Sequence, residues 1–269
     1  MNIYEAYFSP TGTTKAMVST IANRLEEILK TSVETIDFTL PEKRQQVQIF
    51  SKNDLVIFGV PVYAGRVPNI LLKYLSTLEG GGALAVPVVL YGNRNYDDGL
   101  IELGKILETQ GFHTIGAGAF IGEHSFSKIL AKGRPDVKDF KIGKAFADQI
   151  GEKILKEDFS SKPVKIKGED PIRGYYQPRD RKGNPVDIRK VKPKTNKDCV
   201  DCKLCAKVCP MGSIDLEDVS KFIGICIKCG ACIKKCPKQA KYYDDKGYLY
   251  HKEELELGFS RRAEPEVFL

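Results

Sequence analysis

Short apolar runs alternate with longer amphipathic stretches through the first 156 residues of the chain. Apolar runs of this length predict strands, whereas apolar positions that recur every three or four residues predict helices. The predicted strands are Ile3–Phe8, Val33–Phe38, Leu55–Val60, Ala85–Tyr91 and His113–Phe120. The predicted helices are Lys15–Leu29, Asn69–Thr77, Leu100–Gln110 and Lys138–Lys156.

This alternation of strands and helices predicts the fold class. Parallel strands need crossover connections, so the pattern indicates an α/β fold with a doubly wound parallel sheet. Ligands of such sheets bind beyond the carboxyl ends of the strands, where the strand order reverses. We therefore expect the chemistry of this part of the chain in the loops after the first, third and fourth strands.

The loop after the first strand is rich in hydroxyl groups and leads directly into a helix. It reads Ser9-Pro10-Thr11-Gly12-Thr13-Thr14. Hydroxyls and free backbone N–H groups at a helix N-terminus suit a phosphate group. A P-loop would need Lys followed by Ser or Thr, and a dinucleotide fingerprint would need three spaced glycines. Neither is present in the loop, and a helix capped by a hydroxyl without any ligand is the remaining alternative.

This loop resembles the FMN phosphate loop of flavodoxins, with matches at Ser9, Thr11, Gly12 and Thr14. The resemblance implies a five-stranded sheet in the order 2-1-3-4-5 and one FMN that is bound without a covalent link. Pro10 departs from the flavodoxin pattern, because a proline removes one N–H group from the loop.

The same resemblance places the flavin ring against the loops after the third and fourth strands. The ring is a flat apolar plate with polar edges, so it needs an aromatic or apolar cover and backbone partners. The implied contacts are Pro61, Val62, Tyr63, Ala64 and Gly65 in one loop and Gly92, Asn93, Arg94 and Tyr96 in the other. The chain has no tryptophan, so Tyr63 and Tyr96 are the candidates for stacking.

Three side chains near these loops carry further hypotheses. Arg66 or Arg94, if close to the flavin N1, would stabilise negative charge on the reduced ring and raise its potential. His124, in the loop after the fifth strand, is the candidate for delivering protons or contacting a second domain. For each of the three, an ordinary loop side chain without a role at the flavin is the alternative.

All eight cysteines lie in one short stretch of the chain, between Cys199 and Cys236. They form two copies of the run C-x-x-C-x-x-C-x-x-x-C-P. Disulfides are rare in the cytosol, so a compact run of this kind indicates a metal-binding module. A structural zinc site pairs two C-x-x-C knuckles, and it would leave the third cysteine and the proline without a use.

The two runs resemble the cluster motifs of bacterial-type ferredoxins, in which the fourth cysteine of each run ligates the other cluster. The resemblance implies two [4Fe-4S] clusters. The ligands of one would be Cys199, Cys202, Cys205 and Cys236, and those of the other would be Cys226, Cys229, Cys232 and Cys209. Each cluster would tie both runs together, so metal binding would supply much of the folding energy of the module.

The stretch between the two parts is basic and rich in proline, and it holds most of the net charge of +7. Prolines favour extended backbone, so we expect a long linker there. No nucleic-acid motif accompanies the basic residues, and no nucleic-acid partner is expected. The predicted division is a flavodoxin-like domain at 1–156, a linker at 157–196 and a ferredoxin domain at 197–269. The last residues of that domain would dock back on the protein or fray.

Composition limits the setting of the protein. With 42% hydrophobic and 29% charged residues, the chain has the composition of a globular protein. Its longest apolar run is far shorter than the roughly 20 residues of a membrane-spanning helix. The N-terminus has no secretory signal pattern, so a cytoplasmic location is expected.

As a whole the sequence resembles the fused flavodoxin/ferredoxin proteins of anaerobic bacteria and archaea. The resemblance implies an electron-transfer protein that couples one- and two-electron chemistry and exchanges electrons with a partner redox protein such as a ferredoxin. The alternative is a ferredoxin-fed FMN reductase of a quinone, a nitro compound or a conjugated double bond. A redox-sensing adaptor is a third reading. If the linker holds the domains apart, a homodimer with crossed partners is expected.

Overall fold

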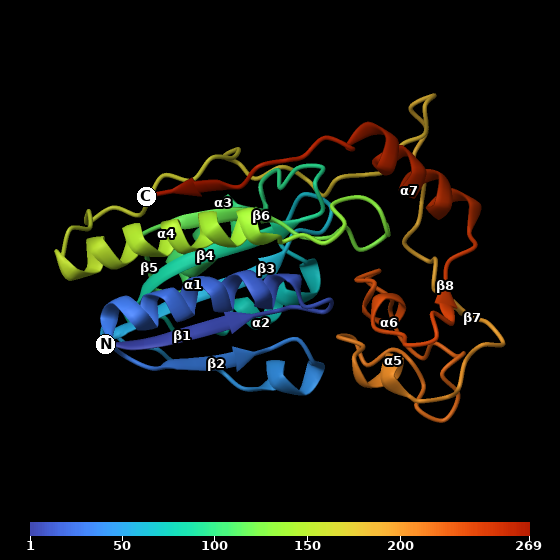
Figure 1. Ribbon diagram of the computed structural model, residues 1–269, viewed down its shortest axis with the longest axis horizontal. Helices are drawn as coiled ribbons and strands as arrows, with labels where there is room; N and C mark the ends of the chain where they lie inside the picture. The colour runs from blue at the N-terminus through green and yellow to red at the C-terminus, as the bar shows by residue number, and fades with distance from the viewer.

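The computed structural model describes residues 1–269, and Figure 1 shows an α/β domain beside a smaller cysteine-rich module. The strands of the α/β domain are β1 Asn2–Tyr7, β2 Val33–Asp37, β3 Asp54–Pro61, β4 Leu84–Tyr91, β5 His113–Thr114 and β6 Ala117–Ile121. Its helices are α1 Thr13–Leu29, α2 Leu72–Leu75, α3 Gly99–Thr109 and α4 Val137–Leu155. Short 3₁₀ helices cover Pro41–Gln45 (η1) and Asn69–Leu71 (η2).

The sheet confirms the predicted doubly wound α/β fold. Its strands follow the order β2-β1-β3-β4-β6, and all of these neighbours pair in parallel. This is the flavodoxin-like order, with the strand order reversing between β1 and β3. The loops after β1, β3, β4 and β6 therefore all lie at the same edge of the sheet. This edge faces the cysteine module (Figure 1).

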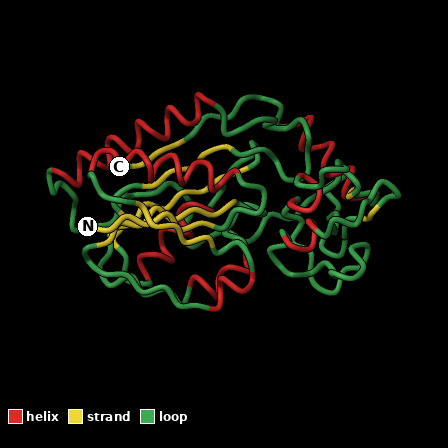
Figure 2. Tube along the Cα trace, turned by 60° about the horizontal axis from the view of Figure 1, so that its bottom comes forward, coloured by secondary structure: helices red, strands yellow, loops and turns green.

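Helices cover both faces of the sheet, as Figures 1 and 2 show. Met17 and Ile21 of α1 pack with Phe146 and Ile150 of α4 in one fully buried core layer. Gly143 lets the two helices approach, because a Cβ there would lie 2.7 Å from the Met17 sulfur. The other layer contains the apolar residues of α2 and α3. Burial of these two layers is the main source of stability for the domain.

The fifth predicted strand, His113–Phe120, is interrupted in the structure. β5 and β6 both pair with β4, and Ile115 and Gly116 lie between them. A Cβ at Gly116 would lie 2.3 Å from Ile150 Cδ1, so α4 packs directly on the backbone at the break. The predicted run covers the positions of both strands, and the close packing of α4 explains the interruption.

The C-terminal tail adds a strand that the sequence did not predict. β9, Glu266–Phe268, pairs antiparallel with β6 at the edge of the sheet, with Gly118 opposite Val267. Of the two fates expected for the tail, the structure therefore has it docked. Because an unpaired edge strand offers free N–H and C=O groups to other chains, the tail also protects this edge.

The segment between the two parts lies on the α/β domain, and we call residues 157–193 the strap. It has no helix or strand. Its Val164 N–H donates to Thr114 O at 3.0 Å, and Tyr176 N–H donates to Ala64 O at 2.8 Å. Arg173 binds the fully buried carboxylate of Asp98 through Nε at 2.9 Å. The basic stretch is thus fastened along the domain surface.

The cysteine module is small and held by few regular elements. They are β7 Lys194–Thr195, α5 Leu204–Lys207, α6 Ala231–Lys234, β8 Lys241–Tyr242 and α7 Lys246–Gly258. The antiparallel pair β7–β8 closes the module, and its apolar core is a cluster of only four buried residues. A core of this size provides little stability, which fits a module that depends on metal for folding.

No helix of the protein has both the length and the apolar character needed to cross a membrane.

Candidate functional site

The hydroxyl-rich loop lies at the N-terminus of α1, a helix of 17 residues. Ser9 Oγ accepts the N–H of Lys15 at 2.9 Å, which folds the loop back over the first turn of the helix. Gly12 is the N-cap residue, with a φ of 99° and no capping side chain. Thr11, Thr13 and Thr14 line a small cavity in front of this helix end. The helix N-terminus and the hydroxyls fit a phosphate group.

Two cavities extend from this loop along the carboxyl edge of the sheet. The small one, of about 60 Å³, contains the phosphate loop, and the large one, of about 300 Å³, opens beside it. Tyr63, Gly92 and His124 line both cavities, so the two cavities adjoin and form one elongated space. A polar end at a helix N-terminus and an aromatic body fit the phosphate and ring of FMN.

Most of the predicted FMN contacts line this space. The structure places there residues of all three loops, namely Thr11, Thr13, Thr14, Pro61, Val62, Tyr63, Ala64, Gly65, Gly92 and Arg94. His124 joins them from the loop after β6. Gly92 lies against the His124 ring, because a Cβ there would be 2.3 Å from His124 Cδ2. The two glycine-containing loops and the histidine therefore enclose the space closely.

The side chain of Asn93 does not face the cavities, although the resemblance implied a flavin contact. It is 2% exposed, and its Nδ2 donates to Phe259 O at 2.7 Å and to Arg261 O at 2.6 Å. Its Oδ1 accepts the Ala263 N–H at 3.2 Å. The φ of 69° suits asparagine, which tolerates the left-handed region better than most residues. Asn93 therefore anchors the C-terminal tail.

Tyr96 is also turned away from the cavities, so it is not placed to stack on a ring in them. It is 3% exposed and packs on Tyr91, with 5.6 Å between the ring centroids. Its hydroxyl donates to Glu266 at 2.8 Å, and burial together with this carboxylate raises the pKa of Tyr96. The sequence position was in the right loop, but the docked tail draws this tyrosine into the core.

The two arginines of the tuning hypothesis differ in their surroundings. Arg66 Nε donates to Glu102 at 2.7 Å, and the guanidinium lies 4.9 Å from the Tyr175 ring centroid. Arg66 therefore fastens the strap to α3. Arg94 lines the large cavity, where it pairs with Asp97 and lies 4.5 Å from the Tyr176 ring centroid. Of the two, only Arg94 reaches the space that fits a flavin ring.

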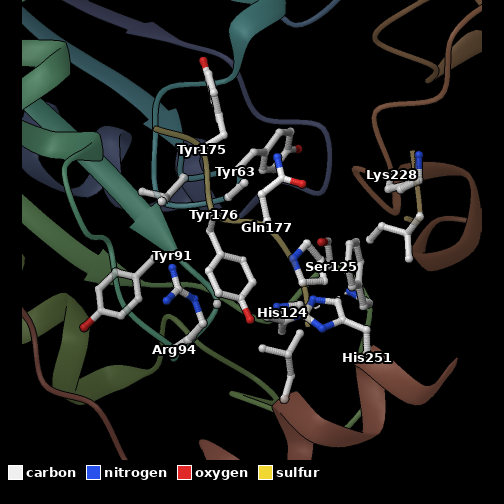
Figure 3. A pocket seen from close by; sticks show the side chains of 18 of the residues that line it. Tyr63, Tyr91, Arg94, His124, Ser125, Tyr175, Tyr176, Gln177, Lys228 and His251 are labelled. Atoms are coloured by element: carbon white, nitrogen blue, oxygen red, sulfur yellow. Dashed lines mark hydrogen bonds between the residues drawn. The ribbon is translucent and has the colours of Figure 1, made fainter. Parts of the chain in front are cut away.

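Strap and α7 residues complete the large cavity, and sequence reasoning did not find them. Tyr175, Tyr176 and Gln177 enter from the strap and His251 from α7 (Figure 3). The Tyr176 and His251 rings are stacked, with 6.2 Å between centroids. The adjacent tyrosines within a basic, proline-rich stretch were the available signal, because tyrosine is buried more often than lysine, arginine or proline.

His124 is half-buried, and its surroundings favour the neutral ring. Burial lowers the pKa of His124 to about 3, and the positive charges of Lys234, His251 and Arg94 lower it further. Its Nδ1 accepts the backbone N–H of Phe126 at 3.1 Å. A ring nitrogen that accepts a hydrogen bond carries no proton, so the proton of the neutral ring is on Nε2. His124 thus provides a neutral N–H donor at the wall of both cavities.

The eight cysteines gather around two further small cavities in the module. One is lined by Cys199, Cys202, Cys205 and Cys236, and we call it the outer site. The other is lined by Cys209, Cys226, Cys229 and Cys232, and we call it the inner site. Each site takes three cysteines from one run and the fourth from the other run. This is the grouping that the ferredoxin resemblance implied.

Both sites have features that suit a cuboidal cluster. The N–H of Ser213 points to Cys209 Sγ at 3.4 Å, and the N–H of Ala240 points to Cys236 Sγ at 3.3 Å. Such N–H to sulfur bonds stabilise the negative charge of ligating thiolates. No three metal-ligating side chains of the protein converge on one point as a single ion would require. The arrangement of four spaced thiolates fits a [4Fe-4S] cluster.

At Gly230 the backbone of the module lies close to the loop after β6 of the α/β domain. The φ of Gly230 is +77°, and a Cβ there would lie 2.7 Å from the backbone oxygen of Ser125. Gly212 also has a left-handed φ, of +57°, but its Cβ would meet nothing nearer than 3.8 Å. A substitution at Gly212 therefore tests the conformational cost of a side chain alone, whereas the same substitution at Gly230 also disturbs the contact between the domains.

We expect Gly230→Ala to weaken the contact between the two domains. A left-handed alanine costs about 1–2 kcal/mol at either glycine, and the forced contact at Gly230 adds about 1–3 kcal/mol. Urea unfolding should show a larger loss of stability for Gly230→Ala than for Gly212→Ala, and a protease should cut the strap faster in Gly230→Ala alone. Equal losses in both variants would contradict this account of the contact.

Residues 164–252 match a protein family described as a 4Fe-4S dicluster domain. The protein contains an iron–sulfur domain of this type after a flavodoxin-like α/β domain. Comparison with curated proteins found no significant match.

Solved structures similar to the α/β domain include several flavodoxins. A flavodoxin from the domain Archaea is 18% identical, with a TM-score of 0.42, and the match covers 58% of this chain and 99% of that one. Flavodoxin 2 from Bacillus cereus is 17% identical, with a TM-score of 0.39, over 57% of this chain and 99% of that one. An NADH:FMN oxidoreductase, EMOB, is 17% identical, with a TM-score of 0.42, over 60% of this chain and 91% of that one.

Proposed function

We propose that this protein transfers electrons between two [4Fe-4S] clusters and one FMN, and so couples one- and two-electron chemistry for a partner redox protein. The observation that carries the proposal is the place of Cys229. This inner-site cysteine also lines the small cavity, together with Thr11 and Gly92 of the candidate FMN loops. The candidate flavin and cluster sites therefore share a wall, and no third element separates them.

FMN supplies redox chemistry in one- or two-electron steps, whereas iron–sulfur clusters supply single electrons. The role of the chain is to hold the two groups together and to exclude water. Thr11, Thr13 and Thr14 would hold the phosphate, and Tyr63 and Gly92 would contact the ring. His124 would offer its Nε2–H to a polar edge of the flavin, since the neutral ring has its proton there.

The fixed arrangement of the two parts supports transfer within one chain. The strap binds the α/β domain before the module, and the tail binds it again after the module. The module is therefore restrained on both sides, which gives its inner site a high effective concentration at the flavin loops. A homodimer with crossed partners is then not needed for the proposed function.

The large cavity favours a second candidate function, the reduction of a small organic acceptor. It extends beyond the flavin loops to the stacked Tyr176 and His251, and Arg94 lies beside them. Flat aromatic walls and a cation suit a quinone or a nitro compound. Turnover assays with quinones, nitro compounds and ferredoxins would distinguish this reductase from an electron carrier.

Metal and flavin analysis tests the proposal directly. After anaerobic purification the protein should contain about eight iron and about eight sulfide ions, and one FMN, per chain. Cys202→Ala, in the outer site, and Cys229→Ala, in the inner site, should each lose about half of the iron. Only Cys229→Ala should also bind FMN more weakly, since Cys229 lines the flavin cavity. Zinc in place of iron, or a protein that binds no flavin, would refute the proposed function.

A further inference from the structure

The two cysteine sites differ in how they meet solvent. Cys229 and Cys232 of the inner site are buried, and that site lies toward the α/β domain through Cys229. In the outer site Cys202 is exposed, and it is the one exposed cysteine of the protein. Val200, next to it, is 58% exposed although it is apolar. An external electron donor or acceptor can thus come closest to a thiolate at the outer site.

The two sites also differ in charge. The lining of the outer site includes Lys203, Lys238 and Lys241 and no acidic residue, whereas the lining of the inner site includes no charged residue. Lys238 is exposed and forms none of the ion pairs of the protein, so its charge is free to act on a partner. Lys203 pairs with Asp201 at 2.8 Å, so the charges of these two side chains offset each other.

Lys241 adds a buried positive charge behind this surface. It is 3% exposed, and its Nζ donates to Thr195 Oγ1 at 2.7 Å and to the backbone oxygen of Val219. Lys238 and Lys241 stand beside four thiolates, and they offset part of the negative charge that would otherwise repel an acidic molecule. The surface is thus apolar at Val200 and Pro237, and Lys238 is its exposed, unpaired cation.

From this exposure and charge we infer that the outer site is the docking surface for an acidic redox protein, the external electron donor or acceptor of this chain. The inference rests on the proposed function and specifies where its partner binds. In the exchange one electron passes between the partner and the outer site, so that one is oxidised and the other reduced, with no bond made. Complementary charge would speed the encounter and orient the two proteins.

A binding measurement tests the inference on the fully loaded protein. The probe is an oxidised, acidic two-cluster ferredoxin, whose affinity is measured by calorimetry at low and at high salt. Lys203→Glu/Lys238→Glu should weaken binding at low salt about tenfold or more, and the difference should shrink at high salt because salt screens exposed charges. Stopped-flow reduction by the same ferredoxin, reduced beforehand, should slow in parallel.

Lys141→Glu/Lys144→Glu is the matched control, because it makes the same charge change on exposed residues of α4, a helix that lies on the α/β domain. It should leave binding within about twofold of the unchanged protein. Photoreduction with a small deazaflavin, which needs no docking, should proceed equally in all proteins. It shows that the clusters are intact.

Two outcomes would overturn the inference. One is that both double variants bind the ferredoxin equally well. The other is that Ile223→Ser/Ile225→Ser, on an exposed apolar surface near the inner site, abolishes binding while Lys203→Glu/Lys238→Glu does not. These failures would occur in protein with full iron and flavin content. They are therefore distinct from a failure of the proposed function, which would appear as missing iron or FMN.

Discussion

Replacing Arg134 by alanine should lower the free energy of unfolding by about 3–5 kcal/mol, because it removes the buried partner of the Asp139 carboxylate and leaves only the partly exposed Arg262, 3.6 Å away. Arg134 Nε donates to Asp139 at 2.8 Å, and the two side chains are 5% and 0% exposed. Another guanidinium nitrogen donates to Ala263 O at 2.6 Å. The backbone oxygen of Arg134 also accepts the Glu123 N–H in the loop that contains His124. The side chain of Arg134 thus joins the start of α4 to the tail, and its backbone oxygen holds the cavity loop.

Arg262→Ala provides the control for this prediction. Arg262 also belongs to the tail contact and pairs with Asp136 at 2.7 Å, but its side chain is 35% exposed. Exposed ion pairs contribute little, so its loss should cost less than about 1 kcal/mol. Urea unfolding of the two variants gives the comparison. Similar small losses in both would show that the buried Arg134–Asp139 pair is not the anchor that we describe.

The second large effect should appear as a dependence of stability on pH, through His124. The folded pKa of about 3 lies below the value of 6.5 for an exposed histidine. The unfolded chain therefore takes up a proton below pH 6.5 that the folded chain does not, and stability falls as pH falls. The stabilisation from neutral His124 is present above pH 6.5. It decreases as the pH falls toward 3, by about 5 kcal/mol in all.

His124→Gln removes this titration and keeps a neutral side chain with an N–H donor. Between pH 7 and pH 5.5 the unchanged protein should lose about 1 kcal/mol more stability than His124→Gln. Urea midpoints measured at both pH values give the difference, and the loss of clusters on unfolding is common to both proteins. If the two midpoints shift by the same amount, His124 is protonated in the folded protein and the assignment of its proton to Nε2 alone is wrong.

The sequence predicted those parts of the fold that depend on local pattern. Amphipathic spacing placed α1 and α4 within two residues of their bounds, and the apolar runs placed every strand of the parallel sheet. Cysteine spacing predicted a grouping that the structure reproduces in two cavities. These features depend on the period of a helix or a strand and on how far a short run can reach, which one sequence contains.

What the sequence did not predict depends on contacts between distant segments. Tyr96 and Asn93 lie in the expected loop, but the tail, which is some 170 residues further along the chain, determines where both side chains point. Likewise Tyr176 and His251 meet only because the strap and α7 pack over the same cavity. Neither the docking of the tail nor that of the strap has a periodic signal, because each depends on a few specific hydrogen bonds and ion pairs.

Because β9 pairs with β6, the α/β domain is complete only in a chain that also contains the cysteine module. The edge of the sheet is closed by a strand that follows the cysteine module in sequence, so the two parts share one structural element. A chain that ended before the module would leave β6 as an open edge, ready to pair with another copy and to aggregate. The tail strand β9 thus protects the flavodoxin-like domain from pairing with another copy, and it reaches that edge only in a chain that contains the cysteine module.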